Sequence, residues 1–70
     1  MELKSHEKRF GMVAMGKGYI TLEQLIEAMR IQVKEDAETG KHRLIGQILI
    51  EMNAISPSQV MKVLDSLDRI

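Results

Sequence analysis

The chain has 70 residues, the length of one small domain. It carries ten Lys and Arg against ten Asp and Glu. It therefore lacks the basic excess with which proteins usually hold nucleic-acid phosphates. One Phe, one Tyr and no Trp also leave few side chains for stacking on single-stranded bases. We expect no DNA or RNA binding, and the absence of Cys excludes disulfides and thiolate metal sites.

The first nine residues, MELKSHEKR, are polar and of mixed charge, and no apolar segment of a secretory signal follows them. No run of residues approaches the roughly 20 apolar positions that a membrane-spanning helix requires. The sequence therefore predicts a cytoplasmic protein without membrane insertion.

A first helix is expected from about His6, because Phe10, Val13 and Ala14 fall on one helical face. Gly11 lies inside this helix, where Gly costs about 1 kcal/mol relative to Ala. Either tight helix packing or the close approach of a ligand to the backbone would explain such a residue. The helix is expected to end in the Gly16–Gly18 turn, where a glycine adopts the left-handed conformation.

The most clearly defined helix is predicted from Leu22 to Asp36. Thr21 at the N-cap with Gln24 three residues later forms a capping box. The apolar residues that follow at helical spacing predict one buried stripe; they are Leu22, Leu25, Ile26, Met29 and Val33. The acidic stretch 35–40, which ends in Gly40, is interpreted as a solvated connection.

A third helix is expected from near Lys41, with its apolar face made by Leu44, Ile45, Ile48, Leu49 and Met52. Asn53 is suited to a left-handed C-cap, and Ser56, Pro57 and Gln59 are the residues of a new helix start. Val60, Val63, Leu64 and Leu67 form the stripe of this fourth helix. No stretch alternates like a strand, so the fold class is all-α.

The two halves of the chain resemble each other with an offset of 35 residues. Gly11 corresponds to Gly46, Gly18 to Asn53, and the capping Thr21 to Ser56. We therefore predict one domain, residues 1–70, of four short helices in two tandem helix–turn–helix repeats. The repeats span about residues 9–32 and 43–67, on either side of the acidic connection.

Catalysis finds no support in the residue pattern. Ser56 and Ser58 are explained by capping, and His6 and His42 stand alone without metal-ligand spacing. The phosphate-binding pattern GxxxxGK[ST] is absent, which argues against ATP hydrolysis. A DNA-reading helix pair is also disfavoured, because Glu23 would face the phosphates. We expect no enzyme activity, no catalytic residue, no metal and no cofactor.

The first repeat resembles a tandem motif in the N-terminal domain (MshEN type) of type II secretion and pilus-assembly ATPases. The residues that carry the resemblance are Arg9-Phe10-Gly11, Ala14-Met15, Gly18, Tyr19-Ile20, Leu25, Met29 and Gln32. The resemblance implies a regulatory module that binds cyclic di-GMP. An Arg can meet or stack on guanine, and the adjacent Gly admits the ligand to the backbone. The implied contacts are Arg9, Phe10, Gly11, Leu25, Met29 and Gln32, with Arg43 and Gly46 from the second repeat.

The second repeat departs from this motif, because Arg43 lies one residue too far from Gly46 and Leu67 replaces the final Gln. One residue turns a helix by about 100°, which is enough to redirect the Arg. The alternative is therefore an adaptor that keeps the fold, has lost the nucleotide, and binds a secretion, pilus or signalling protein. Methionines beside the helical stripes (Met12, Met15 and Met61) suit such a docking surface. A homodimer that enlarges the small core is a further alternative.

Overall fold

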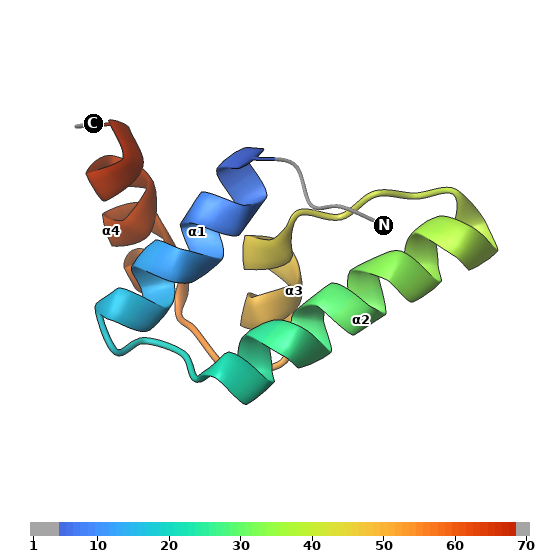
Figure 1. Cartoon of the computed structure of the whole chain (residues 1–70), viewed down its shortest axis with the longest axis horizontal. Coiled ribbons are helices and arrows are strands. Elements are labelled where there is room, and N and C mark those ends of the chain that lie inside the picture. Colours follow the sequence, from blue (N-terminus) through green and yellow to red (C-terminus); the bar gives the residue numbers. More distant parts are fainter. Residues whose placement is uncertain (1–4, 69–70) are drawn as a thin grey trace.

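The computed structural model describes residues 5–68, with the side chains of residues 7–67. Four helices make up this part of the chain, and it contains no strand (Figure 1). They are α1 (Ser5–Gly16), α2 (Leu22–Thr39), α3 (Ile45–Glu51) and α4 (Pro57–Asp68). The predicted all-α class is confirmed.

The helices pack across the two halves of the sequence. The main contacts of α1 are with α4 and α3, and those of α2 are with α3. Figure 1 shows α3 between α1 and α2, with the C-terminal part of α2 extending beyond the other helices. Each half therefore depends on the other for its buried surface. Such interdependence is expected of a domain too small to hold two separate cores.

The two helix-joining turns have the same geometry at the predicted offset. Gly18 and Asn53 adopt φ of 77° and 61°. In each turn, the following residue's amide donates to the carbonyl oxygen five residues earlier, at 3.0 Å. This bond belongs to the Schellman arrangement that closes a helix through a left-handed residue. The prediction of left-handed residues in both turns is confirmed.

Both predicted helix starts are capped as expected. The Gln24 amide donates to Thr21 Oγ1 at 3.1 Å, and the Thr21 amide donates back to Gln24 Oε1 at 2.9 Å. Ser56 and Gln59 repeat this exchange at 3.1 and 3.0 Å. These reciprocal bonds satisfy amides that a helix end would otherwise leave without partners.

The expected boundary between the repeats is displaced. Residues 35–39, interpreted from sequence as a connection, continue α2, which ends at Gly40 in the left-handed conformation. The helix α3 begins at Ile45 rather than near Lys41, because Leu44 before it is extended, with ψ of 149°. The backbone carbonyl of Arg43 points to the core side of α2 and accepts a hydrogen bond from the side-chain Nε2 of Gln32 at 2.8 Å. This tertiary bond replaces the expected helical turn.

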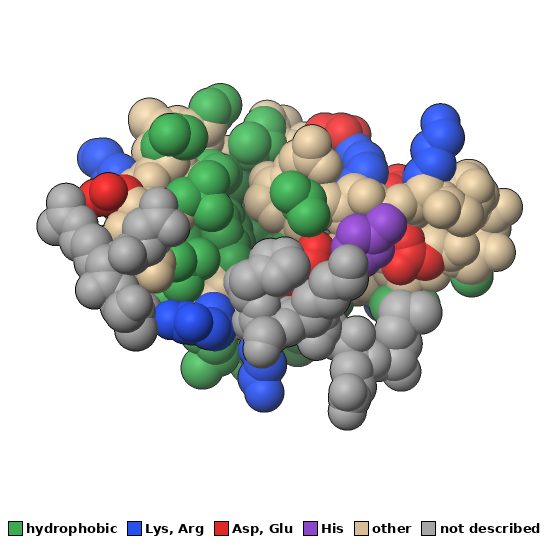
Figure 2. All heavy atoms as spheres, turned by 90° about the horizontal axis from the view of Figure 1, so that it is seen from above, with side chains coloured by type: hydrophobic (Ala, Val, Ile, Leu, Met, Phe, Trp, Pro, Cys, Tyr) green, Lys and Arg blue, Asp and Glu red, His purple; other side chains and the backbone are tan. Residues whose placement is uncertain are grey.

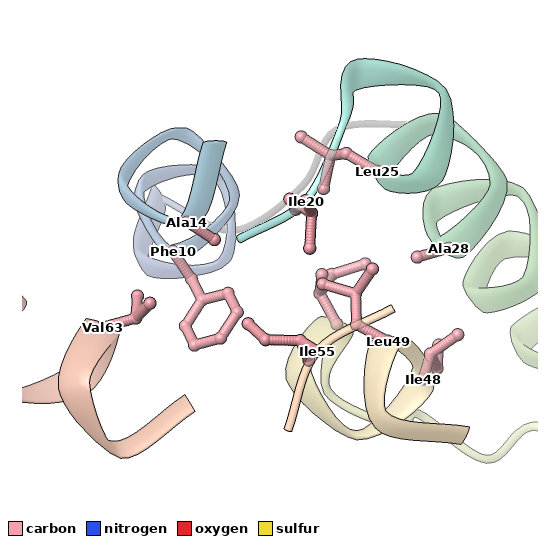
Figure 3. Packing of buried hydrophobic residues seen from close by; sticks show 10 residues of the cluster. Phe10, Ala14, Ile20, Leu25, Ala28, Ile48, Leu49, Ile55 and Val63 are labelled. Carbon is pink, nitrogen blue, oxygen red and sulfur yellow. The ribbon is translucent and has the colours of Figure 1, made fainter. Parts of the chain in front are cut away.

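The core lies where the four helices meet. Figure 3 shows the Phe10 ring between Val63 and Ile55, with Ala14 above it and Leu49 on the facing helix. The fully buried side chains of largest volume are Ile45, Ile48, Leu49 and Val63. Other buried hydrophobic residues are Phe10, Ala14, Ile20, Leu25, Ala28 and Ile55. Three of the largest four come from α3, so the shortest helix is the centre of the core.

The predicted stripe of α2 is only partly buried, which corrects the expectation from sequence. The buried residues of this helix are Leu25, Ala28 and Gln32, which are spaced to face α3. Leu22, Ile26 and Val33 are exposed. The helix is rotated because small Ala28 permits close approach to α3, and the polar Gln32 finds its hydrogen-bond partners inside.

Two glycines are explained by helix packing. A Cβ on Gly11 would lie 2.8 Å from both methyl carbons of Leu25, and one on Gly46 would lie 3.2 Å from Phe10 Cζ. Contacts that close are tighter than van der Waals separation. Of the two explanations for Gly11, the structure supports tight packing, here of the Gly11 backbone against the Leu25 side chain of α2.

Candidate functional site: an apolar groove with a buried carboxyl group

An apolar groove of about 320 Å³ lies between α1, α3 and α4. Its hydrophobic lining residues are Phe10, Leu44, Ile45, Ile50, Val60, Leu64 and Leu67, and Glu7, Gly46 and Gln47 complete it. Figure 2 shows hydrophobic side chains gathered in a band on one face, beside an area of acidic and histidine side chains. The volume is at the lower end of the range for ligand sites. We call this feature the α1–α3–α4 groove.

Glu7 places a carboxyl group in the wall of the α1–α3–α4 groove. Its side chain is 3% exposed. One oxygen, Oε1, accepts a hydrogen bond from Gln32 Nε2 at 3.0 Å. The other, Oε2, is buried and has no hydrogen-bond partner among the residues that the structure describes. Such a group costs about 1–3 kcal/mol, so its presence needs an explanation.

Gln32 joins Glu7 to the segment before α3. Its amide nitrogen donates both to Glu7 Oε1 and to the Arg43 carbonyl oxygen, at 3.0 and 2.8 Å. The Gln32 side chain is buried, so the bond to Glu7 is shielded from water and the bond to Arg43 is partly shielded, and together they hold three segments in register. Gln32 therefore acts as the internal tie between α1, α2 and the start of α3.

His42 lies at the exposed edge of the same polar cluster. Its Nδ1 is 3.1 Å from Asp36 Oδ2, and its Nε2 is 3.3 Å from Glu7 Oε1. The hydrogen bond with Asp36, followed by the bond with Glu7, raises the pKa of His42 above its ordinary value of 6.5. When protonated, the imidazolium donates to both carboxyl groups.

We predict that this cluster makes stability depend on pH. Because the folded-state pKa of His42 is raised, its stabilising contribution is complete below the ordinary value of 6.5. That contribution is lost as the pH rises through the raised pKa. Thermal unfolding should therefore show a higher midpoint at about pH 6 than at about pH 8.5. The His42→Asn variant should reduce this difference, and an unchanged difference would refute the assignment.

Arg43 is held by two acidic residues. Its Nε and Nη2 donate to the two carboxylate oxygens of Glu35 at 2.9 and 2.8 Å, and its Nη1 donates to Glu51. The paired bond with Arg43 lowers the pKa of Glu35, and the same bond raises that of Arg43. The guanidinium thus links the C-terminal part of α2 to the end of α3, and the role of Arg43 in this structure is to join these two helices.

The ligand contacts implied by the resemblance do not converge on one surface. Arg9 is exposed, and no ion pair to it is found within the described part of the chain. It lies two positions after Glu7, a rotation of about 200° around α1, so it points away from Gln32. Phe10, Gly11 and Leu25 are buried, and Met29 is half-buried. Phe10 and Gly46 line the α1–α3–α4 groove.

Sequence reasoning missed the two polar residues that mark this region, Glu7 and His42. Glu7 lies three positions before Phe10, so the helical period places both on one face. A carboxyl group on an apolar face was the available signal. The contact to His42 joins residues 35 positions apart and depends on tertiary packing, so no local pattern predicts it.

Within residues 5–68, no group of His, Asp and Glu side chains is arranged to hold a metal ion. No helix in this described range is both long and apolar enough to cross a membrane. Comparisons with protein-family models, curated proteins and solved structures found no match to the chain.

Proposed function

We propose that the chain is a non-enzymatic adaptor whose α1–α3–α4 groove receives an amphipathic helix from a partner protein. The observation that supports this most is the buried Oε2 of Glu7, which has no hydrogen-bond partner among the described residues and lies in a mostly apolar groove. The helix would bring leucine-type side chains and one Lys or Arg whose N–H reaches Glu7. On this proposal the protein acts in the cytoplasm, and the partner is a secretion, pilus or signalling protein.

The composition of the groove favours this occupant over an anionic one. The groove has seven hydrophobic side chains and no Lys or Arg among its lining residues. Amphipathic helices bind such grooves through apolar anchors spaced three or four residues apart. A single donor among the anchors would satisfy Glu7 and set the register of binding. A helix without a donor would leave Oε2 as it is in the free protein, whereas a helix with a donor would gain a hydrogen bond there, which would give selectivity.

The test is selection from a phage library of random 16-residue peptides on the immobilised full chain. Selected peptides should share helically spaced apolar residues and one Lys or Arg. The Leu64→Glu variant should weaken their binding at least about tenfold, or roughly 1.4 kcal/mol, because the new charge is desolvated in the groove. Fluorescence anisotropy with one selected peptide gives the dissociation constants.

Met61→Glu is the matched control on the same helix. Met61 is 65% exposed and does not line the groove, whereas Leu64 is 43% exposed and does. Equal binding losses in the two variants, or selected peptides without a common basic residue, would contradict the proposed groove. Both side chains reach solvent, so both variants are expected to stay folded by circular dichroism.

Cyclic di-GMP is a second candidate ligand, supported by the exposed Arg9 and by the resemblance of the first repeat. The side chain of Arg9 is available for a guanine or a phosphate. Titration of the ¹⁵N-labelled protein with cyclic di-GMP should then shift the signals of Arg9 and of Gly11 close to it on α1. Arg9→Ala should abolish the shifts and neighbouring Lys8→Ala should not. Unchanged spectra at about 1 mM ligand, a weak-binding limit, would eliminate this candidate.

A further inference from the structure

The exposed side of α2 carries a second apolar surface, separate from the groove. Leu22, Ile26 and Val33 are 56%, 49% and 38% exposed, and Met29 beside them is half-buried. Their spacing of four, three and four residues is the heptad pattern of a helix–helix seam. We call these four residues the α2 stripe.

The α2 stripe lies on a different face of α2 from the one that packs against α3. The buried residues of α2 lie on a different face, roughly a quarter-turn around the helix from the stripe. The stripe extends over about 17 Å at 1.5 Å per residue, three turns of helix. A row of exposed apolar side chains of this kind differs from singly scattered surface residues and is a candidate for contact with another helix.

The charges beside the stripe are divided along the helix. Glu23 and Glu27 flank its N-terminal half, and Arg30 and Lys34 flank its C-terminal half. Glu27 and Arg30 pair within the chain at 3.3 Å, on the surface. A second copy of α2 laid parallel would place like charges together. A second copy laid antiparallel would place acidic against basic residues at both ends.

We propose that two copies of this chain associate through their α2 stripes, with the two helices antiparallel. In this arrangement Ile26 packs against Met29 of the partner subunit, and Leu22 against its Val33. Glu23 then lies opposite Arg30 of the partner subunit, and the two-fold axis repeats this pair. The occupant of the α2 stripe is thus a second α2, and the α1–α3–α4 groove stays open to a different partner.

The expected dimer is weak. Four apolar side chains per copy bury less than the roughly 1,200–2,000 Å² of stable complexes. We therefore expect a monomer–dimer equilibrium with a dissociation constant of about 10 µM to 1 mM. Because the charge pairs are at the surface, added salt should shift the equilibrium toward the monomer.

Charge exchange tests both the surface and the orientation in sedimentation equilibrium of the full chain. Glu23→Arg places two Arg side chains opposite each other and should weaken the dimer at least about tenfold. Arg30→Glu should do the same. The double variant Glu23→Arg/Arg30→Glu should restore dimerisation, as should an equimolar mixture of the two single variants. Circular dichroism verifies that each variant is helical.

Glu38→Arg is the matched control, because Glu38 lies on α2 outside the stripe and its flanks. It makes the same change of charge and should leave the dimer intact. A protein that is still entirely monomeric at about 1 mM, the upper end of the expected range of dissociation constants, would overturn the proposal. A dimer equally unaffected by Glu23→Arg and by Glu38→Arg would also overturn it. Peptide binding in the groove is measured separately, so the two proposals fail independently.

Discussion

Replacing Gln32 with Ala is expected to lower the free energy of unfolding by about 2–4 kcal/mol. The variant loses one buried and one partly buried hydrogen bond and leaves a cavity at the buried Gln32 side chain. Glu7 and the Arg43 carbonyl both lose a donor that the structure places at 3.0 and 2.8 Å. A 70-residue domain has a total free energy of unfolding of about 4–10 kcal/mol, so the substitution should remove a large fraction of it. Urea denaturation followed by circular dichroism gives the value.

Gln47→Ala is the control for this measurement. Gln47 is exposed, and its Oε1 accepts only the Leu44 amide at 3.1 Å among the hydrogen bonds of the described residues. Its removal should cost less than about 1 kcal/mol, the value of one surface capping bond. If the two substitutions cost the same, Gln32 is not the internal tie that the structure indicates. A Gln32 that served mainly as a ligand contact would affect binding while leaving stability nearly unchanged.

Local patterns are sufficient to predict the four helices and the starts of α2 and α4. The capping box at Thr21 and the left-handed turn residue Asn53 were predicted because each depends only on residues within a few positions. The boundary at residues 35–44 was not predicted. There the α2 helix continues because the Arg43 guanidinium forms an ion pair with Glu35, and the side-chain Nε2 of Gln32 donates to the Arg43 carbonyl oxygen. Those bonds form only when the two halves are packed.

In the candidate site, too, the local sequence predicts the helices, whereas the faces that they bury depend on tertiary packing. The hydrophobic period identifies α2 as amphipathic, but it does not decide which of two neighbouring faces of the helix is buried. The choice was made by Ala28 and Gln32, whose size and hydrogen bonding suit the contact with α3. The sequence places Glu7 in a polar N-terminal segment, whereas in the structure it is the only side chain among the described residues with a buried oxygen that lacks a hydrogen-bond partner. The burial of Glu7 depends on the groove that α1, α3 and α4 form together, so it cannot be predicted from the local sequence.

Replacing Phe10 with Ala is expected to cost about 3–5 kcal/mol, enough to unfold much of the protein. Phe10 is buried between α1, α3 and α4, so its removal opens a cavity in the one core that the two halves share. Met12→Ala on the exposed side of the same helix should change stability by less than about 0.5 kcal/mol. If Phe10 were instead an exposed ligand contact, the two substitutions would have similar small effects. Thermal and urea unfolding distinguish these outcomes.

A double-mutant cycle with Gly46 tests whether the Phe10 ring joins the two halves of the chain directly. In the wild type, a Cβ on Gly46 would lie 3.2 Å from Phe10 Cζ, so Gly46→Ala must displace the ring. In the Phe10→Leu background the ring is absent, and the same Ala should gain its helix propensity of about 1 kcal/mol. The double variant should therefore be more stable than the sum of single effects by at least about 0.5 kcal/mol. Additive effects would mean that Phe10 and Gly46 do not touch, and that the two halves meet elsewhere.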